Sequence, residues 1–301
     1  MIFLLFLALS LSNPLPPSLL KNTTDLAEFF HQKCTHAIPQ TLQNDGALSS
    51  LLCGEKITDL NLQKNLTQTS LVHLFVISGS HLILLDELFS KIAMPFFLRF
   101  TLLLFYSLTA SWEAPVVRAL MGLGVRKFHN ARGLHFTSDL SVLATGLLTL
   151  FLFPSWGDSL SLQLSWAASL ALCGPSVFKI RTVYYRILLI QLLVFLFLLP
   201  LLWGFGSLHP LGLLFNIFLA PVIAFVLLPL GLVVVILPNL GPLFDGVLNF
   251  FSMVLFLYSD PIVLPSGTAL ARTSLWVWIG FLHLTFYFGR LYLRQGKDSS
   301  R

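Results

Sequence analysis

Residues 183–204 read VYYRILLIQLLVFLFLLPLLWG, and Arg186 is the only charged residue among them. A helix needs about 20 mostly apolar residues to cross the ~30 Å hydrocarbon core of a bilayer, so this run predicts a membrane-spanning helix. The whole chain of 301 residues has the same character, with 56% hydrophobic and 10% charged residues and a mean hydropathy of +0.83. Soluble domains are far more polar. We therefore predict an all-α polytopic membrane protein.

Further apolar segments surround this run. Together with 183–204 they lie at 71–90, 97–112, 114–124, 138–153, 160–177, 208–236, 243–259 and 273–290. Several are shorter than the ~20 residues of a full crossing, which favours tilted, re-entrant or half-spanning helices. We expect about 7–9 transmembrane or re-entrant helices in total.

Basic residues lie in the gaps between these segments and in the C-terminal tail. The clusters are Lys91 with Arg99; Arg126, Lys127 and Arg132; Lys179, Arg181 and Arg186; and Arg290, Arg294, Lys297 and Arg301. If each apolar segment crosses once, all four clusters fall on one side, which the positive-inside rule makes cytoplasmic. We therefore expect a multi-pass membrane protein with a cytoplasmic C-terminus.

This topology divides the chain into four parts. Residues 1–17 form a signal-like run or partial N-terminal anchor, because their apolar stretch is too short to span a bilayer. Residues 18–70 are polar and are predicted to form a small extracytoplasmic segment. Residues 71–292 form the polytopic domain, and residues 293–301 form a cytoplasmic tail.

The three cysteines match neither a metal-binding spacing nor a CxxC redox motif. Cys34 and Cys53 share the polar segment, so a disulfide can form between them if that segment is extracytoplasmic, and two free thiols are the alternative. Cys173 lies in an apolar run and is expected to act as a small buried hydrophobic residue.

Residues 73–85 read HLFVISGSHLILL and place several polar groups inside an apolar run. On one helix, Ser70, His73, Ser78 and His81 would share a sector of roughly 140°. Polar side chains at bilayer depth line a pathway or pack against another helix, and this segment alone leaves both interpretations open.

The segment from residue 47 to 85 resembles the opening of the competence domain of the ComEC family. Residues 51–56, LLCGEK, are similar to the polar lead-in of that family, and His73, Ile77, Ser78, Gly79 and His81 match its helix motif. The likeness continues in order, with PVVRA at 115–119, LQLSW at 162–166, and Asn216 and Pro221 in FNIFLAP. Two departures are Ser80, where the family usually has leucine, and the acidic Asp86 and Glu87 that follow.

The resemblance implies a channel in the inner (plasma) membrane that passes single-stranded DNA into the cytoplasm during natural transformation. It implies single-stranded DNA and the lipid bilayer as partners, together with a separate nuclease, a DNA receptor, a cytoplasmic translocation motor and further copies of this chain as candidates. Family members often carry a larger extracytoplasmic domain and a C-terminal metallo-β-lactamase-like domain, and we expect this chain to be a minimal version without the latter. No cofactor and no enzymatic activity are expected.

We take a set of polar and small residues as candidates to line the channel or contact DNA: His73, Ser78, Gly79, His81, Arg118, Gln163, Ser165 and Asn216. Hydroxyls, amides, imidazoles and isolated cations can replace the hydration of phosphates, whereas clustered cations would hold them too tightly. The alternatives are snorkelling for Arg118 and helix contacts for the others. A small-molecule or ion transporter and a non-transporting scaffold of a competence complex are rival functions, and a serine hydrolase built on Ser78 and His81 is a weaker one.

Overall fold

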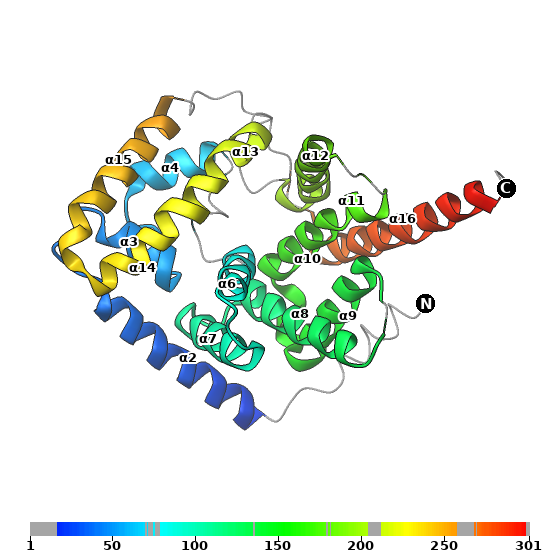
Figure 1. Cartoon of the computed structure of the whole chain (residues 1–301), viewed down its shortest axis with the longest axis horizontal. Helices are drawn as coiled ribbons and strands as arrows, with labels where there is room; N and C mark the ends of the chain where they lie inside the picture. The colour runs from blue at the N-terminus through cyan, green and yellow to red at the C-terminus, as the bar shows by residue number, and fades with distance from the viewer. Residues whose placement is uncertain are drawn as a thin grey trace. The chain divides into compact units, whose positions relative to one another are not determined.

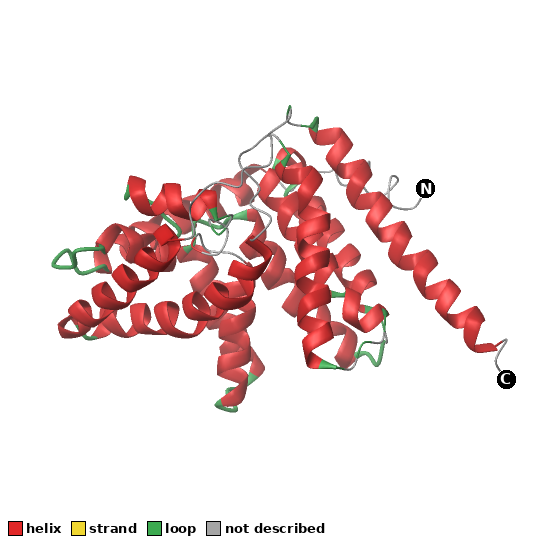
Figure 2. Ribbon diagram, turned by 90° about the horizontal axis from the view of Figure 1, so that it is seen from above, coloured by secondary structure: helices red, strands yellow, loops and turns green. Residues whose placement is uncertain are grey.

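The computed structural model describes residues 17–298, except residues 70, 72–74, 76–78, 135, 179, 181, 204–211, 258–267 and 269. Every regular element in these ranges is a helix, which confirms the predicted all-α class (Figure 2). Contacts between Cα atoms divide the chain into two compact units, which are described separately. Unit 1 comprises residues 1–15, 121–204 and 267–301, and unit 2 comprises residues 16–120 and 205–266.

Three helices among the described residues are long and apolar enough to cross a membrane. They are Val183–Leu202, Ile217–Ile236 and Pro238–Leu257, and the shorter apolar helices are Phe96–Thr109 and Ser138–Leu152. The predicted segment at 71–90 falls short because its described helix begins at Gly79 and contains Asp86 and Glu87. The predicted segment at 114–124 is not among the three spans either. Its helix continues through Arg126 and Lys127 and is too highly charged.

Unit 2 combines residues 16–120, which include the polar N-terminal segment, with one later stretch of the chain (Figure 1). Its helices are α2 (Pro17–Ala37), α3 (Asp45–Cys53), α4 (Leu60–Gln68), α6 (Gly79–Lys91), α7 (Phe96–Thr109), the beginning of α8 (Ala114–Ala131), α13 (Gly212–Val222), the π-helical turn η2 (Ile223–Leu227), α14 (Leu228–Ile236), η3 (Pro238–Leu240) and α15 (Gly241–Leu257).

The core of unit 2 joins α3 and α4 to α14 and α15. Leu48 and Leu66 are fully buried in the same apolar cluster as Leu227 and Phe244. Helix α3 approaches α14 closely because Gly231 has no side chain, and a Cβ placed there would lie 2.7 Å from a methyl group of Leu48. The predicted extracytoplasmic segment therefore shares its hydrophobic core with helices that follow it by more than 150 residues.

Asp245 on α15 holds the turn that precedes α3. Its carboxylate accepts hydrogen bonds from the backbone N–H groups of Gln43 and Asn44, at 3.1 and 3.0 Å, and from the Asn44 side-chain amide at 2.9 Å. A carboxylate that receives several N–H groups is a strong acceptor, so this residue fixes where the turn docks.

Unit 1 consists of helices around α10. They are the remainder of α8, α9 (Ser138–Leu152), η1 (Pro154–Asp158), α10 (Leu160–Leu172), α11 (Gly174–Val177), α12 (Val183–Leu202) and α16 (Arg272–Asp298). Helix α10 contacts α9, α12 and α16. Its Trp166 is fully buried, donates its indole N–H to His283 Nε2 at 2.9 Å, and meets Trp276 edge to face.

The close approach of α9 to α10 depends on Gly146. A Cβ at this position would lie 2.4–2.5 Å from three ring atoms of Trp166, which its buried contacts hold in place. Gly146→Ala is therefore expected to destabilise the protein by about 1–3 kcal/mol through overpacking. Thermal unfolding in detergent measures the effect.

Gly289→Ala provides the matched control, because Gly289 is also inside a helix of unit 1 and a Cβ there meets nothing within 4 Å. Alanine favours the helical backbone over glycine, so this variant is expected to unfold at or above the temperature of the unmodified protein. Equal unfolding temperatures for the two alanine variants would contradict the packing assigned to Gly146.

Candidate functional site

Two of the motifs singled out in the sequence meet at Gly79, the first residue of α6. Gly79 is buried, and a Cβ there would lie 2.9 Å from both the carbonyl oxygen of Pro115 and the Cβ of Ala119. The backbone of α6 therefore lies directly against the first turns of α8. Glycine is needed here because the nearest atoms include backbone, which cannot rotate away as a side chain can.

His81 and Arg118 lie on the same two helices as this contact, two residues after Gly79 and one residue before Ala119. Their exposed fractions are 3% and 5%, so both lie inside unit 2. Both side chains interact with neighbouring groups. Burying a guanidinium group costs free energy unless its interactions compensate for the lost hydration. The buried position of Arg118 therefore depends on the interactions that it makes.

The turn that leads into α8 has an unusual backbone. Ser111 and Trp112 have φ angles of +57° and +53°, which lie in the left-handed region that residues other than glycine rarely adopt. His31 of α2 supports this turn, because its Nδ1 lies 3.0 Å from the Thr109 carbonyl oxygen and 3.0 Å from Ser111 Oγ. Such strained residues persist where the surrounding contacts hold them, often beside functional positions.

The same histidine also contacts the end of α3. Its Nδ1 lies 3.0 Å from the carbonyl oxygen of Cys53, the cysteine that the structure joins to Cys34 in a disulfide. Helix α3 ends there because Gly54 adopts a φ of +82° and donates its N–H to the Ser50 carbonyl. The glycine of the LLCGEK lead-in is thus the residue that stops α3.

Closing the Cys34–Cys53 bridge links residues 19 apart in sequence. A loop of this size stabilises a folded protein by about 3 kcal/mol, so Cys34→Ser/Cys53→Ser is expected to unfold at a clearly lower temperature. Alkylation of the denatured, unreduced protein should label one thiol, that of Cys173, which is the free cysteine. Labelling of all three cysteines before reduction would contradict the bridge.

Asn216 and Pro221 belong to the rod formed by α13, η2 and α14. The Asn216 side chain lies outside the described residues, but its backbone is in α13, and the π-helical turn η2 begins two residues after Pro221. Leu228 donates its N–H to the Ile223 carbonyl, five residues back. Proline lacks the N–H of a regular helix, and π-turns of this kind concentrate at functional sites.

Gln163 and Ser165 belong to α10 and therefore to unit 1. Gln163 is fully buried, and its Nε2 donates to the Arg272 carbonyl at 3.4 Å, while its Oε1 has no hydrogen-bond partner in the structure. Ser165 is half-buried and interacts with its surroundings. His73 and Ser78, and with them most of the predicted polar stripe, lie outside the described residues.

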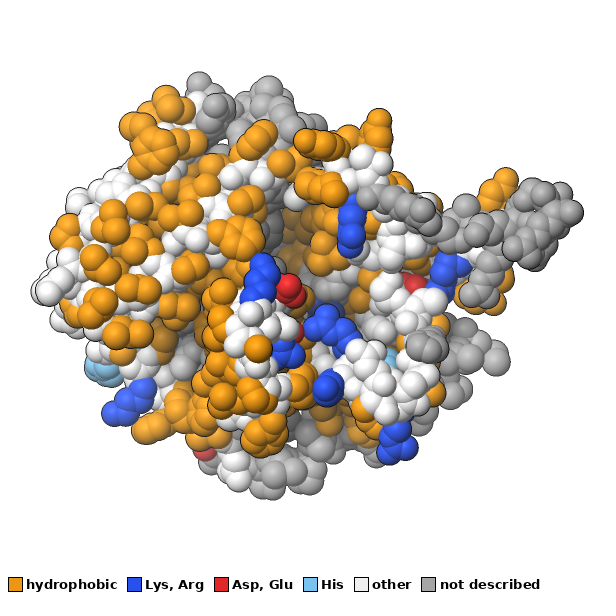
Figure 3. All heavy atoms as spheres, in the orientation of Figure 1, with side chains coloured by type: hydrophobic (Ala, Val, Ile, Leu, Met, Phe, Trp, Pro, Cys, Tyr) orange, Lys and Arg blue, Asp and Glu red, His pale blue; other side chains and the backbone are white. Residues whose placement is uncertain are grey.

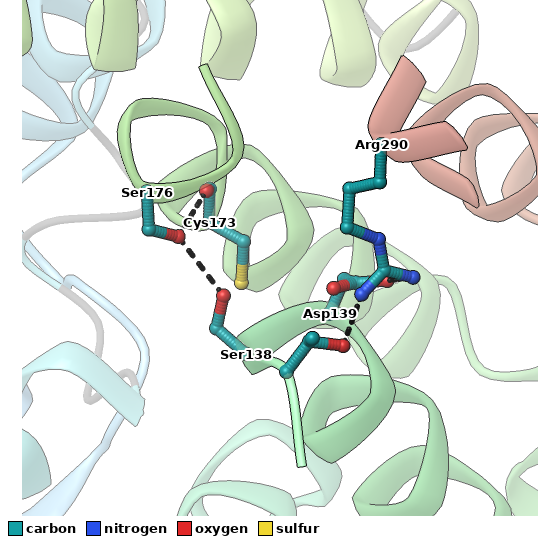
Figure 4. A network of polar contacts seen from close by, with 6 residues as sticks. Ser138, Asp139, Cys173, Ser176 and Arg290 are labelled. Atoms are coloured by element: carbon teal, nitrogen blue, oxygen red, sulfur yellow. Dashed lines mark hydrogen bonds and ion pairs between the residues drawn. The ribbon is translucent and has the colours of Figure 1, made fainter. Parts of the chain in front are cut away.

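A buried ion pair in unit 1 was not foreseen. Asp139, the second residue of α9, is 2% exposed and receives Arg290 Nη2 of α16 at 2.7 Å, while Arg290 Nη1 donates to Thr137 (Figure 4). Ser138 bonds across to Ser176 of α11 at 3.0 Å. The sequence signal was present, since Asp139 is the one acidic residue in the apolar segment 138–153, but its partner is distant in sequence.

Comparison with known proteins identifies the family of this chain. Residues 51–295 match the family model described as "Competence protein". Searches of curated proteins and of solved structures give no significant match. The matched range begins in the LLCGEK lead-in and contains the Gly79–Pro115 contact, Arg118, Gln163 and Asn216. The chain therefore belongs to the competence protein family.

Proposed function

We propose that this protein is the inner-membrane channel through which single-stranded DNA enters the cytoplasm during natural transformation. Membership of the competence protein family supports a role in DNA uptake. The observation that carries the proposal is the enclosure of His81 and Arg118 within unit 2, beside the contact between the two motifs. Ionisable residues at membrane depth are retained mainly where they serve a pathway.

The chemistry of the cargo gives these residues a role. A phosphodiester chain loses hydration when it enters a low-dielectric environment, and imidazole, amide and isolated guanidinium groups replace part of that hydration. A single Arg118 would attract phosphates without the tight binding that a row of cations produces. The chain itself does not hydrolyse DNA in this proposal, and a separate nuclease removes the complementary strand.

The proposed topology has the segment 18–70 outside and the C-terminus in the cytoplasm, with some short helices crossing or re-entering beyond the three long ones. Hydrogen bonds within unit 1 support alternating helix directions. The start of α9 meets the C-terminal part of α16 through Arg290, whereas η1 meets the beginning of α16 where Trp276 Nε1 donates to the Gly157 carbonyl. Basic residues gather at the first of these ends, which the positive-inside rule makes cytoplasmic.

The test is uptake of labelled DNA by cells that lack this protein, with DNA arriving outside the inner membrane measured separately from DNA in the cytoplasm. We expect normal arrival outside and no transfer inward, with full recovery when the gene is restored. Normal inward transfer without the protein would overturn the channel proposal.

A small-molecule or ion transporter is the second candidate, favoured by the buried Asp139–Arg290 pair, because transporters often keep such pairs in their helix bundles. Reconstituted vesicles distinguish the two functions. A channel for DNA should admit labelled single strands, whereas a transporter should move small solutes or ions in the absence of DNA. A scaffold of a competence complex should do neither.

A further inference from the structure

One end of unit 1 presents exposed aromatic and basic side chains that the proposed channel pathway does not use. They are Phe128, Arg132, Phe136, Tyr184, Tyr185 and Arg186, here called the basic–aromatic surface. Tyr184 is 84% exposed and Tyr185 is 66% exposed, both in the first turn of α12. Large aromatic side chains with this exposure are suited to stacking against flat partners.

The end of α8 arranges its aromatic groups in stacked pairs. Arg132 lies over the ring of Phe128, with its guanidinium carbon 5.3 Å from the ring centroid. The chain then reverses at Gly133, whose φ is +64°, and the imidazole of His129 stacks on Phe136 with the centroids 4.2 Å apart. Flat cationic and aromatic groups are thus displayed together on an exposed turn.

One hydrogen bond joins the start of α9 to α11, the short helix that precedes α12. Ser138, the first residue of α9, bonds to Ser176 of α11, and α12 begins seven residues later at Val183. Every charge from residue 126 to 138 and from 176 to 186 is positive. The acidic residue that directly follows the first of these ranges in sequence, Asp139, is buried and paired with Arg290. Figure 3 shows Lys and Arg side chains over α8 and beside α12.

We infer that the basic–aromatic surface binds single-stranded DNA where the strand reaches the cytoplasm. Guanidinium groups would take the phosphates, while the aromatic rings would stack on unpaired bases, a combination that recognises single strands without sequence preference. Lipid phosphates share part of this chemistry. An arginine that snorkels to lipid headgroups extends away from its helix, whereas Arg132 folds back over Phe128. This inference rests on the proposed channel function for one point, which is that the DNA strand arrives at this end of unit 1.

The experiment measures binding of fluorescent oligothymidylate to the purified full chain in nanodiscs of zwitterionic lipid. Phe128→Ala/Arg132→Ala is expected to weaken binding by at least about tenfold, since stacking on one aromatic ring and one phosphate contact are both lost. The slope of log affinity against log salt should fall by about 0.7 for the lost contact.

Phe29→Ala/Lys33→Ala is the matched control. Lys33 lies over Phe29 at 5.7 Å with the same four-residue spacing, and Phe29 is 53% exposed against 54% for Phe128. This pair lies on α2 in the segment proposed to be extracytoplasmic, so its loss should leave the affinity unchanged. Tyr184→Ala/Arg186→Ala tests the α12 part independently and should also weaken binding.

The outcomes separate the alternatives. Unchanged affinity in both surface variants, or equal loss in the α2 control, would overturn the inference. If the surface serves lipid instead, the variants will keep their affinity for DNA and lose stabilisation by phosphatidylglycerol in the nanodisc. If the channel proposal alone is wrong, the purified protein will still bind DNA through this surface while inward DNA transfer in cells does not depend on the protein.

Discussion

Arg118→Leu is expected to reduce inward DNA transfer by about ten- to a hundredfold, while capture of DNA at the cell surface stays normal. The variant removes a buried cation from the first turns of α8, and a charge-assisted hydrogen bond from such a cation to a passing phosphate would contribute about 1.5–3 kcal/mol. Each 1.4 kcal/mol added to a barrier slows a step about tenfold. Cytoplasmic and surface-bound label, measured in the same cells, give the two quantities.

Three controls separate a pathway defect from a folding defect. Arg118→Lys keeps the charge and should recover part of the transfer, and His81→Leu should impair the same step. Leu84→Ile, a volume-conserving change on a half-buried position of α6, should leave transfer unchanged. Normal transfer by Arg118→Leu and His81→Leu proteins that accumulate to normal levels would remove both residues from the pathway and favour the transporter or scaffold.

Asp139→Ala is expected to destabilise the protein by about 3 kcal/mol, because it leaves the Arg290 guanidinium without its carboxylate in a largely enclosed position. The cost should lie at the lower end of the range for buried pairs, since the Arg290 side chain keeps 17% of its exposure. Thermal or denaturant unfolding in detergent would measure it.

The double variant Asp139→Ala/Arg290→Met decides whether the effect belongs to the pair. Once the cation is gone as well, no uncompensated charge remains, and replacement of both partners is often close to neutral. Unfolding of the double variant should therefore lie nearer to that of the unmodified protein than either single variant does. Strictly additive losses would show that the two side chains act independently.

Helix positions were predictable wherever apolar length defines them. The predicted segments 183–204 and 138–153 agree closely with α12 at Val183–Leu202 and α9 at Ser138–Leu152. The segment at 71–90 was less predictable, because Asp86 is accommodated inside α6 by its ion pair with Arg99 at 3.5 Å. A partner from another helix made an acidic residue compatible with a buried position, and single-sequence patterns do not contain that information.

The candidate site likewise has a part that local sequence motifs predict and a part that depends on tertiary packing. Motifs with a fixed local order made Gly79, Arg118 and Gln163 candidates from the sequence alone, but they did not predict the contact of Gly79 with Pro115. The pairing of Trp166 with His283 joins residues 117 apart, and Asp139 and Arg290 are farther apart still. Periodicity reports which face of a helix is polar, whereas the identity of the facing helix depends on tertiary packing.

The hydrogen bonds of Asp245 have a consequence for the order of synthesis. Asn44 is synthesised 201 residues before Asp245, whose carboxylate accepts its hydrogen bond. At about 5–20 residues per second, this interval lasts about 10–40 s. For most of that time Leu48, Leu51 and Leu66 lack the α14 and α15 surfaces that later cover them. We therefore expect the newly made segment to remain incompletely packed until a helix near the other end of the chain has been translated.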